Sequence, residues 1–131
     1  MIVWDGGRCV EGFCLADRMP DGFITPPPDE YGHSHWDNGP ELKVSLVHGR
    51  ITTIQMFEVL FFQGEQLIGQ QIDEVARLLF ESEREREESL LPSGAVLSIV
   101  SGRRRDFDVQ LWAWDDEVRH VDLQDFDWIE D

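Results

Sequence analysis

Three extended segments in the last third of the chain are joined by turns that leave room only for antiparallel pairing. Residues 95–100 are almost all apolar, residues 107–114 alternate apolar side chains with polar or aromatic ones, and residues 118–123 return to an extended pattern. Parallel neighbours need a crossover of about a dozen residues or more. The segments therefore predict an antiparallel meander.

The middle of the chain predicts a second hairpin and one helix. Residues 42–46 and 51–57 are β-like and flank a His48-Gly49 turn. Apolar side chains then recur with helical spacing from Ile72 to Leu79, and helix-forming residues continue to Glu88. We expect an α+β fold: a mostly antiparallel curved sheet of about five to seven strands, with one main helix over residues 71–88 packed on one face.

Size and charge narrow the class of protein. The chain has 131 residues, which is the length of one domain, 1–131. Its 27 acidic and 11 basic residues give a net charge of −16, which disfavours binding to nucleic acid. No segment is apolar enough for a membrane span, and the N-terminus lacks a signal pattern. We expect a cytoplasmic monomer or weak dimer without a membrane association.

The first third of the chain contains the two cysteines and a long loop. Cys9 and Cys14 would face opposite sides of one extended strand, so we expect two buried free thiols and a reducing compartment. Residues 19–40 are rich in proline and glycine, which predicts an irregular loop. Within it, His33 and His35 are candidate metal ligands. No spaced partner motif supports them, so solvated loop histidines are the favoured interpretation.

Motifs of catalysis and nucleotide binding are not found. The chain has neither a G-x-S-x-G elbow nor a G-x-G-x-x-G or P-loop pattern, and we expect no enzyme and no cofactor. His120 is expected at an exposed strand position. The basic run Arg103-Arg104-Arg105 could bind phosphate, but a solvated hairpin turn is favoured.

An acidic and aromatic group in the C-terminal third is the main candidate for partner binding. Trp112 and Trp114 lie on the strand face opposite Phe107, so they are either exposed or part of a second core layer. A tryptophan ringed by carboxylates suits a hot spot for a basic partner. The candidate residues are Trp112, Trp114, Asp108, Asp115, Asp116, Glu117, Asp125, Asp127 and Trp128.

Part of residues 47–79 resembles a known kind of protein. The strings VHGRITTI (47–54), FQGEQLIG (62–69) and DEVARLL (73–79) are similar to a hairpin, linker and helix pattern in small bacterial proteins. Some of these resemble immunity proteins of polymorphic toxin systems. The resemblance implies a hairpin followed by a helix, and it carries over no catalytic residue.

Three hypotheses of function follow. The leading one is an immunity-type inhibitor that binds a cognate basic toxin, such as a nuclease, through the acidic tryptophan surface and blocks it sterically. The alternative is an intracellular adaptor that docks another protein through the proline-rich loop. The third is a metal-dependent enzyme that uses His33 and His35.

Overall fold

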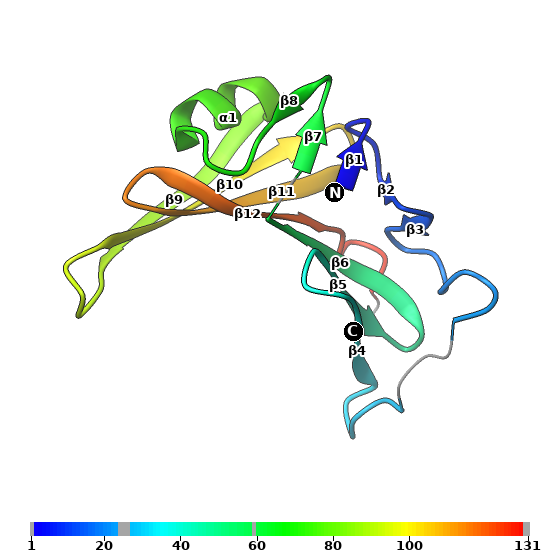
Figure 1. Ribbon diagram of the computed structural model, residues 1–131. Helices are drawn as coiled ribbons and strands as arrows, with labels where there is room; N and C mark the ends of the chain where they lie inside the picture. The colour runs from blue at the N-terminus through cyan, green and yellow to red at the C-terminus, as the bar shows by residue number, and fades with distance from the viewer. Residues whose placement is uncertain (1, 24–26, 59, 130–131) are drawn as a thin grey trace.

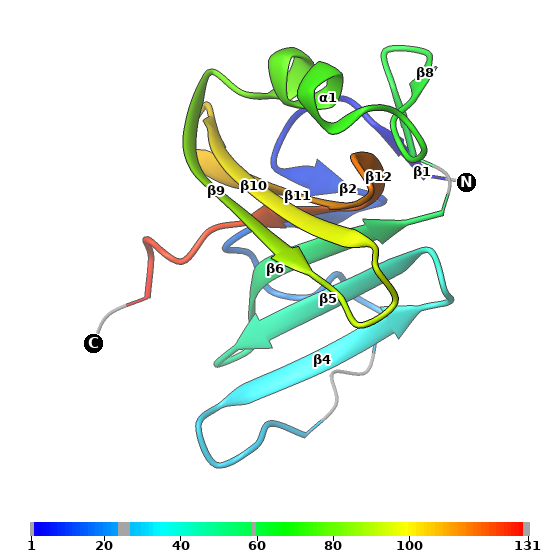
Figure 2. The same ribbon diagram turned by 90° about the vertical axis from the view of Figure 1, so that its left-hand side faces the viewer.

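A seven-stranded antiparallel sheet forms the body of the molecule, in the order β4-β5-β6-β12-β11-β10-β9 (Figures 1 and 2). The computed structural model describes residues 2–23, 27–58 and 60–129. The strands of this sheet are β4 (His33–Asn38), β5 (Leu42–Val47), β6 (Arg50–Phe57), β9 (Ser82–Leu90), β10 (Val96–Arg104), β11 (Phe107–Trp114) and β12 (Glu117–Gln124). The predicted α+β class, the C-terminal meander and the 42–57 hairpin are confirmed.

Helix α1 (Ile72–Leu79) and two small sheets lie on one side of the large sheet. The first small sheet has the order β1-β7-β8, in which β1 and β7 are parallel, and the second is the β2–β3 pair. Their strands are β1 (Ile2–Trp4), β2 (Cys9–Val10), β3 (Phe13–Cys14), β7 (Leu60–Phe62) and β8 (Glu65–Gln66). The large sheet bends between β12 and β6, and these elements cover only one of its faces (Figure 1). We call the covered side the inner face and the other the outer face.

The core fills the inner face. Phe107, Val109 and Leu111 of β11 are fully buried, as are Val75 and Leu79 of α1. Burying one such side chain stabilises the fold by about 1.5–3 kcal/mol. The alternation along β11 thus places its even-numbered residues on the outer face, as the period of two requires.

The helix is much shorter than predicted. It ends where Phe80 adopts an extended conformation, and residues 82–90 form strand β9 instead of a helical extension to 88. The apolar stripe stops at Phe80, so a longer helix would have no face to bury. Eight residues of β9 pair with β10, and the hydrogen bonds of this pairing outweigh the helix propensity of glutamate and arginine.

Part of the predicted loop at 19–40 is also a strand. Residues 33–38 form β4, which pairs antiparallel with β5, so the irregular segment is shorter than expected. The prolines do not prevent this pairing, because Pro20, Pro27, Pro28 and Pro40 all lie outside the strand.

The expectation of free cysteines is wrong. Cys9 and Cys14 form a disulfide across the β2–β3 hairpin. The prediction placed both residues on one strand, whereas the turn at Glu11 and Gly12 brings them opposite each other in the register. Since disulfides persist in oxidising surroundings, the bond removes the cysteine argument for a reducing compartment.

Candidate functional site

The two tryptophans singled out in the sequence lie on the outer face of β11. Trp112 and Trp114 are half-buried, and they point away from the core residues Phe107, Val109 and Leu111. No described helix or strand crosses this face (Figures 1 and 2). The alternative left open by the sequence is thereby resolved: the tryptophans are surface residues rather than part of a second core layer.

Strand register extends Trp112 and Trp114 into a row of aromatic side chains. Phe57 of β6 pairs with His120 of β12, which in turn pairs with Trp112. The His120 ring lies 4.8 Å from the Phe57 ring and 4.9 Å from the Trp112 ring, on which it stacks. Trp114 lies 6.5 Å from His120. We call Phe57, His120, Trp112 and Trp114 the aromatic row.

Apolar and cationic groups border the aromatic row. Ile99 and Leu97 of β10 pair with Trp112 and Trp114 and are half-buried on the same face. At the other end, the Lys43 ammonium lies 5.5 Å from the centre of the Phe57 ring. The aromatic row, Ile99 and Leu97 therefore form one apolar band across four neighbouring strands, β6, β12, β11 and β10, and Lys43 of β5 borders its Phe57 end.

The His120 imidazole of this band lies beside a buried carboxyl group, that of Asp122. Asp122 is 2% exposed, and its Oδ1 atom lies 3.4 Å from Nε2 of His120. Burial raises the pKa of Asp122 to about 7, against the opposite effect of the Gln55 amide that donates to it. Burial also lowers the pKa of His120 to about 4. Between about pH 4 and pH 7, the favoured state is therefore a protonated Asp122 beside a neutral His120 imidazole. The expectation that His120 is exposed is wrong.

An amide network continues from Trp112 towards the edge strand. The Trp112 indole N–H donates to Oε1 of Gln110 at 2.9 Å, and the Gln110 amide donates to the Ser101 hydroxyl at 3.3 Å. Beside this network lies a polar recess of about 250 Å³. Its lining residues are Arg84, Glu85, Ser101, Asp108, Gln110 and Gln124.

Trp114 borders a second, more open recess. This recess has a volume of about 440 Å³ and is lined by Ala95, Trp114, Asp115 and Arg119. Its wall is mainly apolar because the indole ring forms one side. The Trp114 end of the aromatic row is thus the part most open to a side chain from another molecule.

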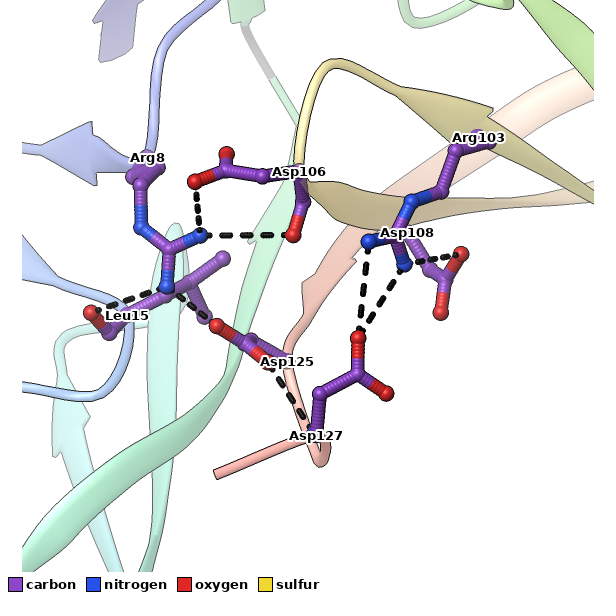
Figure 3. A network of polar contacts seen from close by, with 7 residues as sticks. All are labelled: Arg8, Leu15, Arg103, Asp106, Asp108, Asp125 and Asp127. Atoms are coloured by element: carbon purple, nitrogen blue, oxygen red, sulfur yellow. Dashed lines mark hydrogen bonds and ion pairs between the residues drawn. The ribbon is translucent and has the colours of Figure 1, made fainter.

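Asp125 and Asp127, two of the predicted partner-binding acids, bind arginines of the same chain instead (Figure 3). Asp125 is buried and pairs with Arg8, which also contacts Asp106 at 3.1 Å. Asp127 pairs with Arg103 at 3.4 Å. The Arg8 guanidinium lowers the pKa of Asp106 below its usual range. These contacts tie the N-terminal hairpin and the segment after β12 to the β10–β11 turn.

Asp108 and Trp128 are engaged in the same way. Asp108 lies on the outer face, but its Oδ1 atom is 3.3 Å from both Arg84 and Arg103. Trp128 is half-buried with the Arg50 guanidinium 5.7 Å from the centre of its ring. Both residues therefore stabilise this fold directly, whether or not a partner binds.

The remaining predicted acids form the tip of the β11–β12 hairpin. Asp115 and Asp116 both have positive φ, and the Asp115 carboxylate accepts the Val96 N–H at 2.9 Å. The Asp116 carbonyl accepts the N–H of Ile72, the first residue of α1, at 2.8 Å. Glu117 lies 3.9 Å from Arg119. Asp115 and Asp116 are both exposed, and Asp115 lines the Trp114 recess.

The other candidates from the sequence are dispersed. Arg104 donates to the carbonyls of Gly6 and Leu79, so it holds the end of α1. His33 and His35 lie on β4, where His35 contacts the Ser45 hydroxyl at 3.1 Å. In the described ranges, no three histidine, cysteine, aspartate or glutamate side chains gather as a metal site requires. Nor does any helix among these residues have the length and apolar character to cross a bilayer.

Sequence reasoning missed Phe57, His120 and Asp122, as well as the glutamates of β9. The spacing of His120 and Asp122 places both on one strand face, which was a usable signal. Phe57 could be found only from the pairing of β6 with β12, strands that are far apart in the sequence. The glutamates of β9 were assigned to a helix, which concealed their alternation.

Comparison with known proteins adds no relative: the chain matches no family model, no curated protein and no solved structure.

Proposed function

We propose that this chain is an immunity-type inhibitor that binds a basic protein toxin through the outer face and blocks it sterically. The observation that carries the proposal is the aromatic row on a sheet face that no described element covers. Clustered, partly exposed tryptophans supply contact area at little cost in side-chain entropy. An uncovered face of this kind suits a partner protein better than solvent.

The charge of the chain indicates what kind of partner fits. A net charge of −16 gives an electrostatic field that attracts basic proteins and repels acidic ones. Toxins that cleave nucleic acid need a basic groove for phosphates, so an acidic inhibitor can occupy the same groove. The resemblance of residues 47–79 to immunity proteins supports the same choice of partner.

The internal ion pairs change the proposed binding residues. Trp112 and Trp114 remain the anchors, now together with Phe57 and His120 of the aromatic row. The charges that complement the partner are the exposed Asp115 and Asp116 at the hairpin tip and the glutamates of β9, because Asp108, Asp125 and Asp127 already pair with arginines.

The test is capture of a partner from lysate of the source organism, followed by purification of the captured protein. We expect a basic protein that salt releases, whose activity falls when this chain is added. Trp114→Ala should weaken its binding at least about tenfold, as for a central anchor. The control is Tyr31→Ala, which removes a side chain that is 70% exposed in the proline-rich loop.

The control variant also separates the main proposal from the adaptor hypothesis. If Tyr31→Ala abolishes binding and Trp114→Ala does not, the chain docks through its loop. If the captured protein keeps full activity when saturated with this chain, the inhibitor proposal is wrong.

A further inference from the structure

Strand β9 forms a long edge of the large sheet, and one side of its backbone has no partner among the described residues. It pairs with β10 over Ser82–Leu90 and lies last in the strand order. All nine of its residues are exposed. The β9–β10 hairpin projects from the body of the molecule, so another chain can approach this edge (Figure 1). Edge strands with free N–H and C=O groups are templates for strand addition.

Two sets of backbone contacts at the end of the β9–β10 hairpin show which residues of β9 form hydrogen bonds with β10. The Leu91 N–H donates to the Ala95 carbonyl at 2.8 Å, so these two residues form a hydrogen-bonded pair. The next pair, Leu90 and Val96, is then not hydrogen-bonded. Independently, the Val96 N–H and carbonyl bond Asp115 on the opposite side. Both observations give the same alternation along β9.

This alternation identifies the backbone groups that face outward. Between Leu90 and Glu85 the pairing with β10 is regular, and the register shifts only beyond Ser101. Arg86, Glu88 and Leu90 therefore direct their N–H and C=O groups away from β10. The free edge offers three consecutive pairing positions to an added strand.

The side chains of β9 determine which strand can add. Glu85 and Glu87 pair with Ser101 and Ile99, so they lie towards the outer face, next to the apolar band. Neither forms an ion pair within the described chain. A second copy of β9 would bring glutamates opposite glutamates, which is unfavourable, whereas lysine or arginine at alternate positions would pair with them.

We propose that β9 receives an extended basic segment of the partner as an eighth strand of the large sheet. Main-chain hydrogen bonds to Arg86, Glu88 and Leu90 hold the segment, and its alternate lysine or arginine side chains lie beside Glu85 and Glu87. The added strand continues the outer face, so the rest of the partner reaches the aromatic row. This inference rests on the proposed function, since it describes how the same basic partner docks.

The test uses a labelled peptide of the same length as β9, in which lysine and threonine alternate. Glu88→Pro removes an outward N–H that β10 does not use, and Glu88→Ala removes the same charge but keeps the N–H. Loss of a main-chain hydrogen bond and the steric block predict about tenfold weaker binding to Glu88→Pro than to Glu88→Ala. A peptide that alternates lysine and proline has the same charge and should bind both variants equally weakly.

Amide hydrogen exchange of the wild-type chain gives a second measurement that needs no substitution. We expect fast exchange at Arg86, Glu88 and Leu90, and slow exchange at Glu87 and Ser89, whose N–H groups face β10. The lysine–threonine peptide should slow the first set only. Equal peptide binding by the two Glu88 variants, or unchanged exchange at Arg86, Glu88 and Leu90, would overturn strand addition.

The two proposals fail in different ways. If the captured partner loses affinity for Trp114→Ala but binds the two Glu88 variants equally, the inhibitor proposal stands and strand addition is wrong. If the peptide protects the β9 edge while no basic protein is captured, the edge accepts strands but the inhibitor proposal is wrong.

Discussion

The buried Asp122 and the half-buried His120 are an acid and a base whose effects on stability oppose each other. Burial raises the Asp122 pKa from 3.8 to about 7, so the folded state retains a proton that the unfolded state releases, and stability falls as pH rises through this window. Burial lowers the His120 pKa from 6.5 to about 4, so stability rises with pH between these values. In the wild type, the two slopes largely cancel between pH 4 and 6.5.

Single substitutions should separate the contributions of Asp122 and His120 to the pH dependence of stability. Relative to the wild type, Asp122→Asn should gain stability as pH rises from 4 to 7, and His120→Gln should lose it from 4 to 6.5. For each variant, the difference from the wild type in the free energy of unfolding should change by at most about 1.4 kcal/mol per pH unit. Urea unfolding across this pH range measures both differences. Parallel curves for the wild type and Asp122→Asn would mean that Asp122 titrates normally in the folded state.

Gly102 leaves room for the ring of Phe80, the residue that directly follows α1. A Cβ atom built on Gly102 would lie 2.3 Å from the Phe80 ring, which packs directly over this position of β10. Gly102→Ala should therefore destabilise the fold by about 1–3 kcal/mol, the usual cost of overpacking. Denaturant unfolding measures the change in stability. Gly94→Ala is not a suitable control, because Gly94 has a positive φ and alanine there would itself strain the backbone. A better control is the double variant Gly102→Ala with Phe80→Ala, in which the added methyl group should cost far less than it does alone.

Among the elements, the β2–β3 hairpin is the one most dependent on a single covalent bond. Its two paired positions are too few for stability on their own, and the Cys9–Cys14 disulfide closes the turn. The adjacent Arg8 then reaches Asp125 and the Leu15 carbonyl (Figure 3). The disulfide thus supports the clamp that joins the N-terminal segment to the segment after β12.

Removal of this disulfide should lower the free energy of unfolding by about 2 kcal/mol, from loop-closure entropy for so short a loop. The comparison is between the wild type and a variant with both Cys9→Ser and Cys14→Ser. A dithiol reductant should destabilise the wild type to the level of the variant and leave the variant unchanged. No effect of reductant on wild-type stability would mean that the thiols are not paired in solution.

The sequence predicted correctly those elements whose conformation follows from burial in the core. It failed for β9, whose conformation follows from pairing with the edge of the sheet. The meander, the 42–57 hairpin and the buried face of α1 follow from apolar periodicity, which directly reflects the core. Strand β9 has no buried residue, so it lacks the apolar alternation that marks a half-buried strand, and its helix-forming composition favoured a helix. Its conformation is determined by the unpaired edge of β10, a tertiary effect.

The candidate site shows the same division. Alternation along β11 placed Trp112 and Trp114 on the correct face without any knowledge of the fold. The acids around them could not be sorted, because whether a carboxylate is free depends on which arginines the topology brings near. Arg8 is far from Asp125 in the sequence, yet their side chains pair. Composition alone therefore overestimated the number of acids available to a partner.

At the scale of the whole molecule, long-range charge and short-range contact should act on different steps of binding. The net charge of −16 attracts a basic partner before contact, so the association rate constant should fall steeply as ionic strength rises. The aromatic row acts only after contact. Trp114→Ala should therefore increase the dissociation rate constant and change the association rate constant little.

A variant with both Glu85→Gln and Glu87→Gln should behave in the opposite way to Trp114→Ala. It keeps the shape of β9 but removes two exposed charges from the docking side, so its association rate constant should be lower and less sensitive to salt. Surface plasmon resonance with the purified partner at several salt concentrations measures both rate constants. The control is Glu11→Gln with Glu30→Gln, which removes the same charge from exposed positions outside the large sheet. If both charge variants slow association equally, only the total charge matters, and the glutamates of β9 have no special role in docking.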